Sequence, residues 1–191
     1  MKKVISILIL VMAIASASWT VMADETDILI LTEGRTNWNF TEEEVVEDDL
    51  ITVLEAGVNT ASAMNASPWS FSVVKDHDLI QELAFGEGVK TAPIMIIVSV
   101  PENNTNIFDA GLAMQSMQIA ARILGYATKI EIMPVLRIRN DEKGEYRSRF
   151  GIPEGKEPQA ALFVGHADVE ADAVSHASTK ADYDSIVTIV E

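Results

Sequence analysis

The chain has 191 residues, of which 48% are hydrophobic, and its 14 basic and 29 acidic residues give a formal net charge of −15 at pH 7. A chain of this length and apolar content can bury one sizeable core, whereas so negative a surface repels phosphate backbones and argues against a nucleic-acid partner. Cysteine is absent, which excludes disulfides, thiolate metal sites and a lipid-modified cysteine.

The first 23 residues are typical of a secretory signal peptide. Two lysines precede an apolar run over residues 4–15, and Val21-Met22-Ala23 offers small residues at the usual cleavage spacing. We therefore expect an exported protein, extracellular or periplasmic, with one mature domain over residues 24–191. An uncleaved membrane anchor is the alternative, because residues 4–23 are long enough to span a bilayer. Only in that case would the membrane be a partner.

The chain then alternates strand-like and helix-like patterns. Residues 28–31 are a short apolar run of the kind found in strands. Thr41 and Glu44 have the spacing of a capping box, which predicts a helix start with acidic residues in its first turn. The apolar residues that follow at four-residue spacing predict one buried stripe on a helix that ends near Gly57, formed by Val46, Leu50, Leu54 and Val58.

Four elements are predicted in the middle of the chain. Residues 70–74 alternate serine with large apolar side chains, a strand signal, and residues 76–85 predict a short helix. Residues 94–100, with the sequence IMIIVSV, lie between two prolines and predict a strand buried on both faces. Residues 108–124 carry only Asp109 and Arg122 as charges, so we expect this helix at the centre of the core or in a subunit interface.

The C-terminal part is less regular. Residues 127–137 alternate loosely and contain Pro134, which favours an edge strand. Residues 140–150 are charged and predict a short surface helix, and residues 160–164 predict another buried strand that ends at Gly165. Residues 182–190 form a closing β-like stretch. No internal repeat and no long linker divides the chain.

Several familiar catalytic motifs are missing from the sequence. It has no nucleophile elbow around a serine, no Walker loop, no dinucleotide glycine fingerprint and no pair of histidines at helical spacing. His77, His166 and His176 are far apart along the chain, so we expect no metal site. The many carboxylates lie on predicted solvated helix faces, where no burial would separate their pKa values for acid and base roles.

The most informative stretch covers residues 55–76 and reads EAGVNTASAMNASPWSFSVVKD: an apolar helix end, a small polar turn, and Pro68-Trp69 before a strand. It resembles the flavin-contacting turn of the nitroreductase family, roughly A-x-x-A-P-S-x-x-N-x-Q-P-W-x-F-x-V-V. Ala61 replaces the family's proline and Ser67 its glutamine. The matching residues are Ala56, Ser62, Asn65, Pro68, Trp69, Phe71, Val73 and Val74.

Two later segments resemble the same family. Residues 109–125, DAGLAMQSMQIAARILG, are similar to its central helix, D-x-G-x-A-x-Q-x-x-x-L-A-A-x-x-L-G. Residues 150–155, FGIPEG, with the strand that ends at Gly165, are similar to its L-G-I-P-x-G and the strand after it. The resemblance spans nearly all of residues 35–191. It implies an α+β fold with a mostly antiparallel central sheet flanked by helices, in a homodimer whose subunits share the flavin sites.

The resemblance also implies an FMN site. Gly34 and Trp38 stand where the family usually carries positive charge, and Asp182 stands where a second basic residue often helps, so we expect the FMN phosphate to be held less tightly. The implied contacts are Ser62 and Asn65 at the edge of the flavin ring, Ile132 and Met133 near its reactive nitrogen, and Arg35, Thr36, Ser178 and Lys180 at the phosphate.

By this resemblance the protein is expected to be an FMN-dependent oxidoreductase. It would take hydride or electrons from NADH, NADPH or another donor and pass them to a small-molecule acceptor such as a nitroaromatic or a quinone. No catalytic side chain is required, because the flavin supplies the redox chemistry. Two alternatives stay open: a non-catalytic exported binding or structural protein that keeps the fold with a weakened or lost flavin site, and an acidic exported domain whose similarity is accidental.

Overall fold

The computed structural model describes residues 35–83, 91–171, 176–177 and 183–190, together with Leu29 and Leu31. The predicted signal peptide over residues 1–23 lies outside them. In chain order the elements are β1 (Arg35–Thr36), α3 (Glu47–Val58), the 3-10 turn η1 (Ala63–Asn65), β2 (Ser70–Val74), α4 (His77–Leu83), β3 (Ile94–Val100), α5 (Asn104–Ile123), β4 (Ala127–Glu131), α6 (Met133–Arg139), α7 (Glu145–Arg149), β5 (Glu157–Gly165), β6 (His176–Ala177) and α8 (Tyr183–Ile186).

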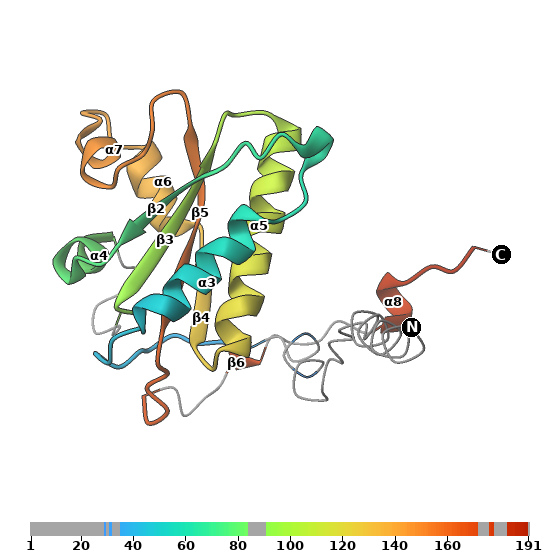
Figure 1. Cartoon of the computed structure of the whole chain (residues 1–191), viewed down its shortest axis with the longest axis horizontal. Coiled ribbons are helices and arrows are strands. Elements are labelled where there is room, and N and C mark those ends of the chain that lie inside the picture. Colours follow the sequence, from blue (N-terminus) through green and yellow to red (C-terminus); the bar gives the residue numbers. More distant parts are fainter. Residues whose placement is uncertain are drawn as a thin grey trace, which may run out of the picture.

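The centre of the fold is an antiparallel sheet with the strand order β2-β3-β5-β4 (Figure 1). Every residue of β3 is buried, as predicted from its continuous apolar run, because helices cover both faces of the sheet. The bounds of β2 and β3 are those predicted, and β5 begins three residues before the predicted strand. The α+β class is therefore confirmed.

Two helical layers enclose this sheet. On one face α3 and α5 pack together over β3 and β5, where Met117 of α5 and Leu162 of β5 are fully buried. On the other face α4 and α6 bury Ile80 and Ile138 against Met95 of β3. The two core clusters therefore lie on opposite sides of one sheet, between the sheet and the helices that cover it (Figure 1).

The predicted start of the first helix is wrong. The helix α3 begins at Glu47, with Val46 as an extended N-cap, so Thr41 is not the cap. The Thr41 hydroxyl instead accepts the Glu43 N–H at 3.3 Å, while the Thr41 N–H donates to the carbonyl of His166 at 2.8 Å. This distant partner holds the segment extended. The buried stripe is Leu50, Val53 and Gly57, and the predicted stripe residues Val46 and Val58 are exposed.

The helix α5 is longer than predicted and has two distinct sides. It starts at Asn104, because the Asn103 side chain accepts the Asn106 N–H at 2.8 Å and caps the helix. Its buried side includes Asp109, Met114 and Met117. Its other side exposes apolar residues such as Phe108, which is 66% exposed. The prediction of a helix central to the core is thus confirmed for one side only.

Three predictions for irregular regions need correction. The strand predicted over residues 127–137 ends at Glu131 and gives way to α6, since Pro134 lies in the first helical turn, where a missing N–H costs nothing. The β-like stretch predicted over residues 182–190 is wrong, because Tyr183–Ile186 is helical and residues 187–190 are irregular. Leu29 and Leu31 are also helical, contrary to the strand predicted there.

The remaining helix predictions hold. Both α4 and α7 fall within the predicted ranges 76–85 and 140–150.

The Tyr126 hydroxyl donates to Asp49 at 2.7 Å and accepts the Val46 N–H at 3.2 Å, which fastens the start of α3 beside β4. Burial, reinforced by the Asp49 carboxylate, raises the pKa of Tyr126. None of the helices in the described part of the chain is long and apolar enough to cross a bilayer.

Candidate functional site

The turn over residues 62–67, called here the 62–67 turn, carries unusual backbone strain. Met64, Asn65 and Ser67 have φ angles of 52°, 55° and 44°, in the left-handed region that residues with a side chain rarely adopt. Each such residue costs about 1–2 kcal/mol. Strain of this kind persists only where surrounding contacts hold it, and it is concentrated at functional sites.

Contacts at the beginning of the turn and within it hold this conformation. The Ala63 N–H donates to both carboxylate oxygens of Asp109 at 3.2 Å, and Asp109 is only 2% exposed. Within the turn the Ser67 N–H donates to the Ser62 hydroxyl oxygen at 2.9 Å. Asp109 belongs to the buried side of α5, so the turn is fixed to the longest helix in the described part of the chain. Sequence reasoning identified Asp109 as a motif residue but not as the anchor of this turn.

The turn presents hydrogen-bond donors to its surroundings. Because the Ser62 oxygen is the acceptor in the contact with Ser67, its own proton stays available for donation. The Asn65 side chain is exposed, and Met64 is 97% exposed at the apex. This combination of a preorganised backbone, a hydroxyl and an amide suits a planar ligand with acceptor atoms along its edge, as the resemblance implied for Ser62 and Asn65.

The predicted phosphate side lies beside β4. There β1 pairs with β6, the Asn37 N–H donates to the Thr128 carbonyl at 3.2 Å, and Phe40 bridges to Ala167. Thr36 is half-buried in this layer. The side chain of Arg35 lies outside the described part of the chain, as do Ser178 and Lys180.

Trp38 has a partner that the sequence did not reveal. Its ring lies over the ammonium of Lys129, with 3.9 Å between Nζ and the ring centroid. Lys129 also pairs with Glu131 at 2.8 Å and is only 4% exposed. A positive charge therefore contacts Trp38, although it comes from β4 and is largely balanced by a carboxylate.

Ile132 and Met133 follow β4 directly. Ile132 is 58% exposed and Met133 is 38% exposed, which is high for large apolar side chains between a strand and a helix. Ile132 is the N-cap of α6, and Met133 opens that helix. The resemblance implied both residues near the flavin's reactive nitrogen, and their exposure leaves them free to contact a ligand or another subunit.

The 62–67 turn and the predicted phosphate contact Thr36 lie far apart within one chain. The 62–67 turn is held by Asp109, near the start of α5, whereas the Thr36 segment bonds to Thr128, just beyond the end of that helix. The helix rises about 1.5 Å per residue, so these two anchors lie about 20 Å apart along its axis. Figure 1 shows the teal turn and β6, the partner of β1, at opposite ends of α5.

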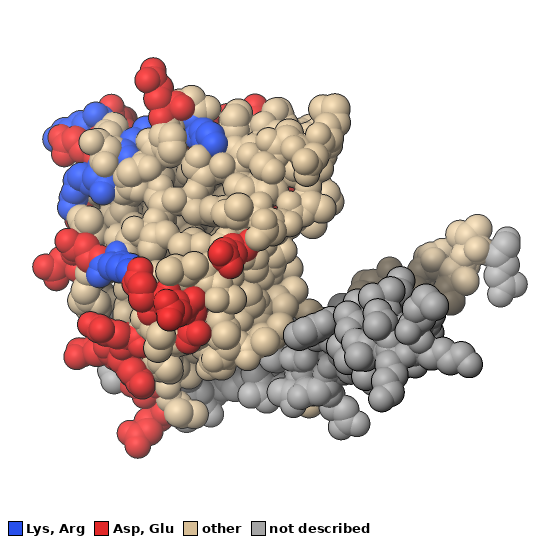
Figure 2. Space-filling view, viewed as in Figure 1, with Lys and Arg blue, Asp and Glu red and all other residues tan. Residues whose placement is uncertain are grey.

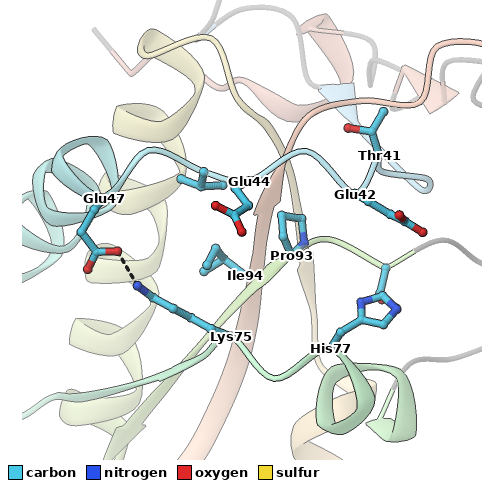
Figure 3. Close-up of a pocket in the computed structure, with 10 residues that line it drawn as sticks. Thr41, Glu42, Glu44, Glu47, Lys75, His77, Pro93 and Ile94 are labelled. Carbon is cyan, nitrogen blue, oxygen red and sulfur yellow. Dashed lines mark hydrogen bonds and ion pairs between the residues drawn. The ribbon is translucent and has the colours of Figure 1, made fainter.

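A cavity of about 530 Å³ lies elsewhere, between the start of α3 and the start of β3 (Figure 3). Its walls include Glu42, Glu44 and Glu47, the last paired with Lys75, and none of the predicted site residues. Three carboxylates would repel a phosphate dianion, so this cavity does not suit the phosphate of FMN. The described residues also contain no group of three or more side chains that could hold a metal ion.

Two distant archaeal relatives are among the curated proteins that match this chain in sequence, whereas no family model matches it. A protein of Methanothermobacter thermautotrophicus, provisionally named an NADH dehydrogenase/NAD(P)H nitroreductase, is 28% identical over 137 residues, which cover 66% of this chain and 70% of the relative. A protein of Archaeoglobus fulgidus with the same provisional name is 24% identical over 144 residues, 70% of this chain and 80% of the relative.

Solved structures match the whole described fold. A nitroreductase with bound FMN from Desulfitobacterium hafniense superimposes with a TM-score of 0.76 at 25% identity, covering 88% of this chain and all of that one. A nitroreductase with bound FMN from Bacteroides fragilis has a TM-score of 0.72 at 22% identity, with the same coverage. The same arrangement of sheet and helices therefore occurs in both proteins over their full length.

Proposed function

We propose that this chain is an FMN-dependent oxidoreductase of the nitroreductase type, because proteins of that name resemble it in sequence and in fold. The observation that carries the proposal is the 62–67 turn, whose strained backbone is fixed by a buried carboxylate while its donors face outward. A solvated connection between a helix and a strand would need neither the strain nor the anchor. The FMN bound in the two related structures supports the same assignment.

The side chains present fit FMN in their chemistry. The Ser62 hydroxyl and the Asn65 amide can donate to acceptor atoms at the ring edge, and Ile132 and Met133 offer exposed apolar contact. Bound FMN supplies the hydride and electron transfer itself. The chain therefore binds and orients the cofactor, and no side chain is proposed as a catalytic acid or base. The proposed phosphate contacts are Arg35, Thr36, Ser178 and Lys180.

We propose that each FMN site is shared between the two subunits of a homodimer. The separation of about 20 Å along α5 between the turn and the Thr36 segment supports this arrangement, in which one copy supplies the ring contacts of the turn and the other the phosphate contacts. Figure 2 shows that the surface over α5 and the turn is largely uncharged, unlike the side formed by α4 and α7. Exposed apolar residues there are Ile107, Phe108, Leu112 and Ile123 on α5, and Met64 in the turn.

The electron donor and acceptor are proposed more broadly. We propose NADH or NADPH as the donor, which the names of the archaeal relatives support, and a nitroaromatic or quinone as the acceptor. An exported chain would need another donor or a retained anchor, because reduced nicotinamide is a cytoplasmic compound. Export through the predicted signal peptide stays a prediction of the sequence.

The direct test of the proposed function is the visible spectrum of the purified protein. We expect flavin absorbance and the release of FMN on denaturation. We expect Asn65→Ala to weaken FMN binding about threefold to tenfold, the effect of one lost hydrogen bond. Asn140→Ala, which removes an exposed amide in the loop after α6, should leave the affinity unchanged. A colourless protein that cannot be reconstituted with FMN would refute the proposal.

Sharing of the site is tested by mixing two defective variants. One variant combines Ser62→Ala with Asn65→Ala, and the other combines Arg35→Ala with Thr36→Val. Each alone should bind FMN weakly. When the two are co-expressed, random pairing should restore wild-type affinity to about a quarter of all sites, because each mixed dimer then contains one intact site. If both halves of the site belonged to one chain, mixing would restore none.

A further inference from the structure

Lys156 lies immediately before β5 and reaches across to the end of the 62–67 turn. Its ammonium donates to the Pro68 carbonyl at 2.9 Å, to the Trp69 carbonyl at 3.1 Å and to the Ser70 hydroxyl at 2.7 Å. A lysine ammonium has three protons, and here all three are used on consecutive residues. These residues form the passage from the strained turn into β2.

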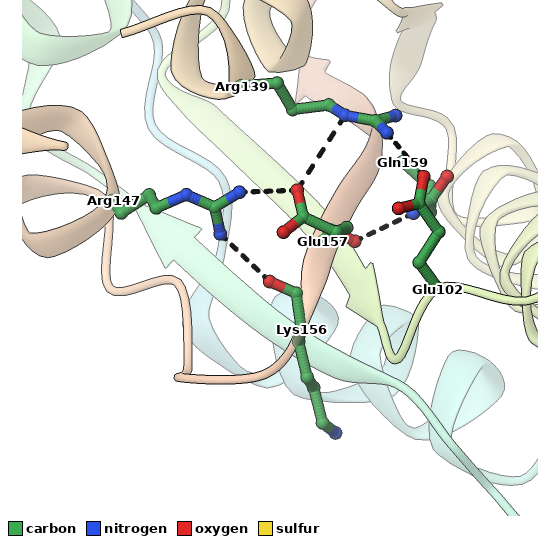
Figure 4. Close-up of polar contacts among 6 residues, drawn as sticks. All are labelled: Glu102, Arg139, Arg147, Lys156, Glu157 and Gln159. Carbon is green, nitrogen blue, oxygen red and sulfur yellow. Dashed lines mark hydrogen bonds and ion pairs between the residues drawn. The ribbon is translucent and has the colours of Figure 1, made fainter. Parts of the chain in front are cut away.

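No carboxylate in the described part of the chain is paired with this ammonium. The nearby acid, Glu157, is paired with Arg147 and Arg139, and Arg147 also donates to the Lys156 carbonyl at 3.1 Å. Figure 4 shows the Lys156 side chain running away from this cluster. Burial lowers the pKa of Lys156. The Lys156 ammonium therefore binds the end of the turn and forms no ion pair with a described carboxylate.

Two residues that are distant in the sequence, but belong to the same chain, anchor the turn at its opposite ends. Asp109 holds the Ala63 N–H at the beginning, and Lys156 holds the Pro68 and Trp69 carbonyls at the end. Between them lie the three residues with left-handed backbone, Met64, Asn65 and Ser67. A strained segment relaxes once one end is released, so both anchors are needed to keep Ser62 and Asn65 in place.

We propose that Lys156 is a positioning residue for FMN: it fixes the end of the 62–67 turn so that the Ser62 hydroxyl and the Asn65 amide are held ready at the ring edge. The proposal rests on the proposed function for its ligand, but the ordering of the turn is a property of the flavin-free protein as well. Lys156 itself need not touch the cofactor. Its effect on affinity arises from preorganisation of the binding groups.

The test compares Lys156→Met with Lys143→Met, which removes an equivalent charge from the exposed loop before α7. In the flavin-free protein we expect Lys156→Met to accelerate amide hydrogen exchange within residues 62–67 by about tenfold, the effect of losing a charge-assisted hydrogen bond. Exchange in β3 should stay unchanged. The FMN dissociation constant, measured by titration, should rise by about the same factor. The Lys143→Met variant should match the wild type in both measurements.

An unchanged exchange rate at residues 62–67 in folded Lys156→Met would overturn the proposal, and so would accelerated exchange with unchanged FMN affinity. If the wild type binds no FMN, the proposed function fails while the exchange experiment still tests the role of Lys156 in ordering the turn. Should Lys156→Met not fold, Lys156→Gln keeps a shorter donor group. Lys156→Gln should also accelerate amide exchange within residues 62–67, but by a smaller factor than expected for Lys156→Met. An unchanged exchange rate in this variant would overturn the proposal.

Discussion

Asp109→Ala is expected to release the 62–67 turn and to weaken FMN binding by about tenfold or more, because the change removes the buried carboxylate that accepts the Ala63 N–H. An unsatisfied buried donor costs about 1–3 kcal/mol, and the strained residues Met64, Asn65 and Ser67 would then relax. Isothermal titration with FMN and urea unfolding of the flavin-free protein measure the two effects.

Asp109→Asn is the matched control for this prediction. The amide keeps the size of the side chain and one acceptor oxygen, so it can still receive the Ala63 N–H. We expect it to retain most of the FMN affinity and most of the stability that Asp109→Ala loses. Equal losses in both variants would contradict the prediction, because the negative charge and not the hydrogen bond would then be what the site requires.

Gly165→Ala is expected to destabilise the fold by about 1–3 kcal/mol through overpacking. A Cβ at this position would lie 2.6 Å from Pro93 Cδ and 3.2 Å from Phe40 Cδ1. Both atoms belong to rings, which cannot move aside as a flexible chain end can. Phe40 pairs with Ala167 and anchors the segment that carries Thr36. Urea unfolding should show the loss, and FMN affinity should fall because the proposed phosphate side shifts.

A double-mutant cycle with Pro93→Ala separates this clash from other causes. Pro93→Ala removes the Cδ and Cγ atoms that the new methyl would meet, so Gly165→Ala should cost less in that background. We expect a favourable coupling of about 0.5–3 kcal/mol, the range found for residues in contact. Strictly additive losses would show that the steric argument is wrong, even if Gly165→Ala alone is destabilising.

These two predictions also give a physical reason for two of the motif residues, Gly165 and Asp109. Gly165 was predicted only as the end of a strand, and Asp109 only as the first letter of a helix motif. In the fold Gly165 leaves room for Pro93 and Phe40, and Asp109 accepts the Ala63 N–H. Local sequence patterns cannot predict these contacts, because the partner residues are more than forty positions away.

Local sequence patterns determined the elements with the strongest periodicity. The alternation in residues 70–74 and the unbroken apolar run in residues 94–100 predicted β2 and β3 with their bounds, since a buried strand must be apolar on each face that is covered. Three motifs in order also identified the α+β family fold and the residues of the turn. These conclusions needed only neighbouring residues, whose spacing reports directly on burial.

Only the tertiary structure decided where α3 begins, how the 62–67 turn is held, and how far it lies from Thr36. The His166 carbonyl holds Thr41 away from a capping role, while Lys156, just before β5, and Asp109, in α5, reach the turn. Each depends on which groups meet across the sheet, and the free energy of such contacts outweighs weak local preferences. The sequence thus indicated a turn that resembles a flavin-contacting one, whereas the fold showed how this turn is held and that it lies far from Thr36 in the same chain.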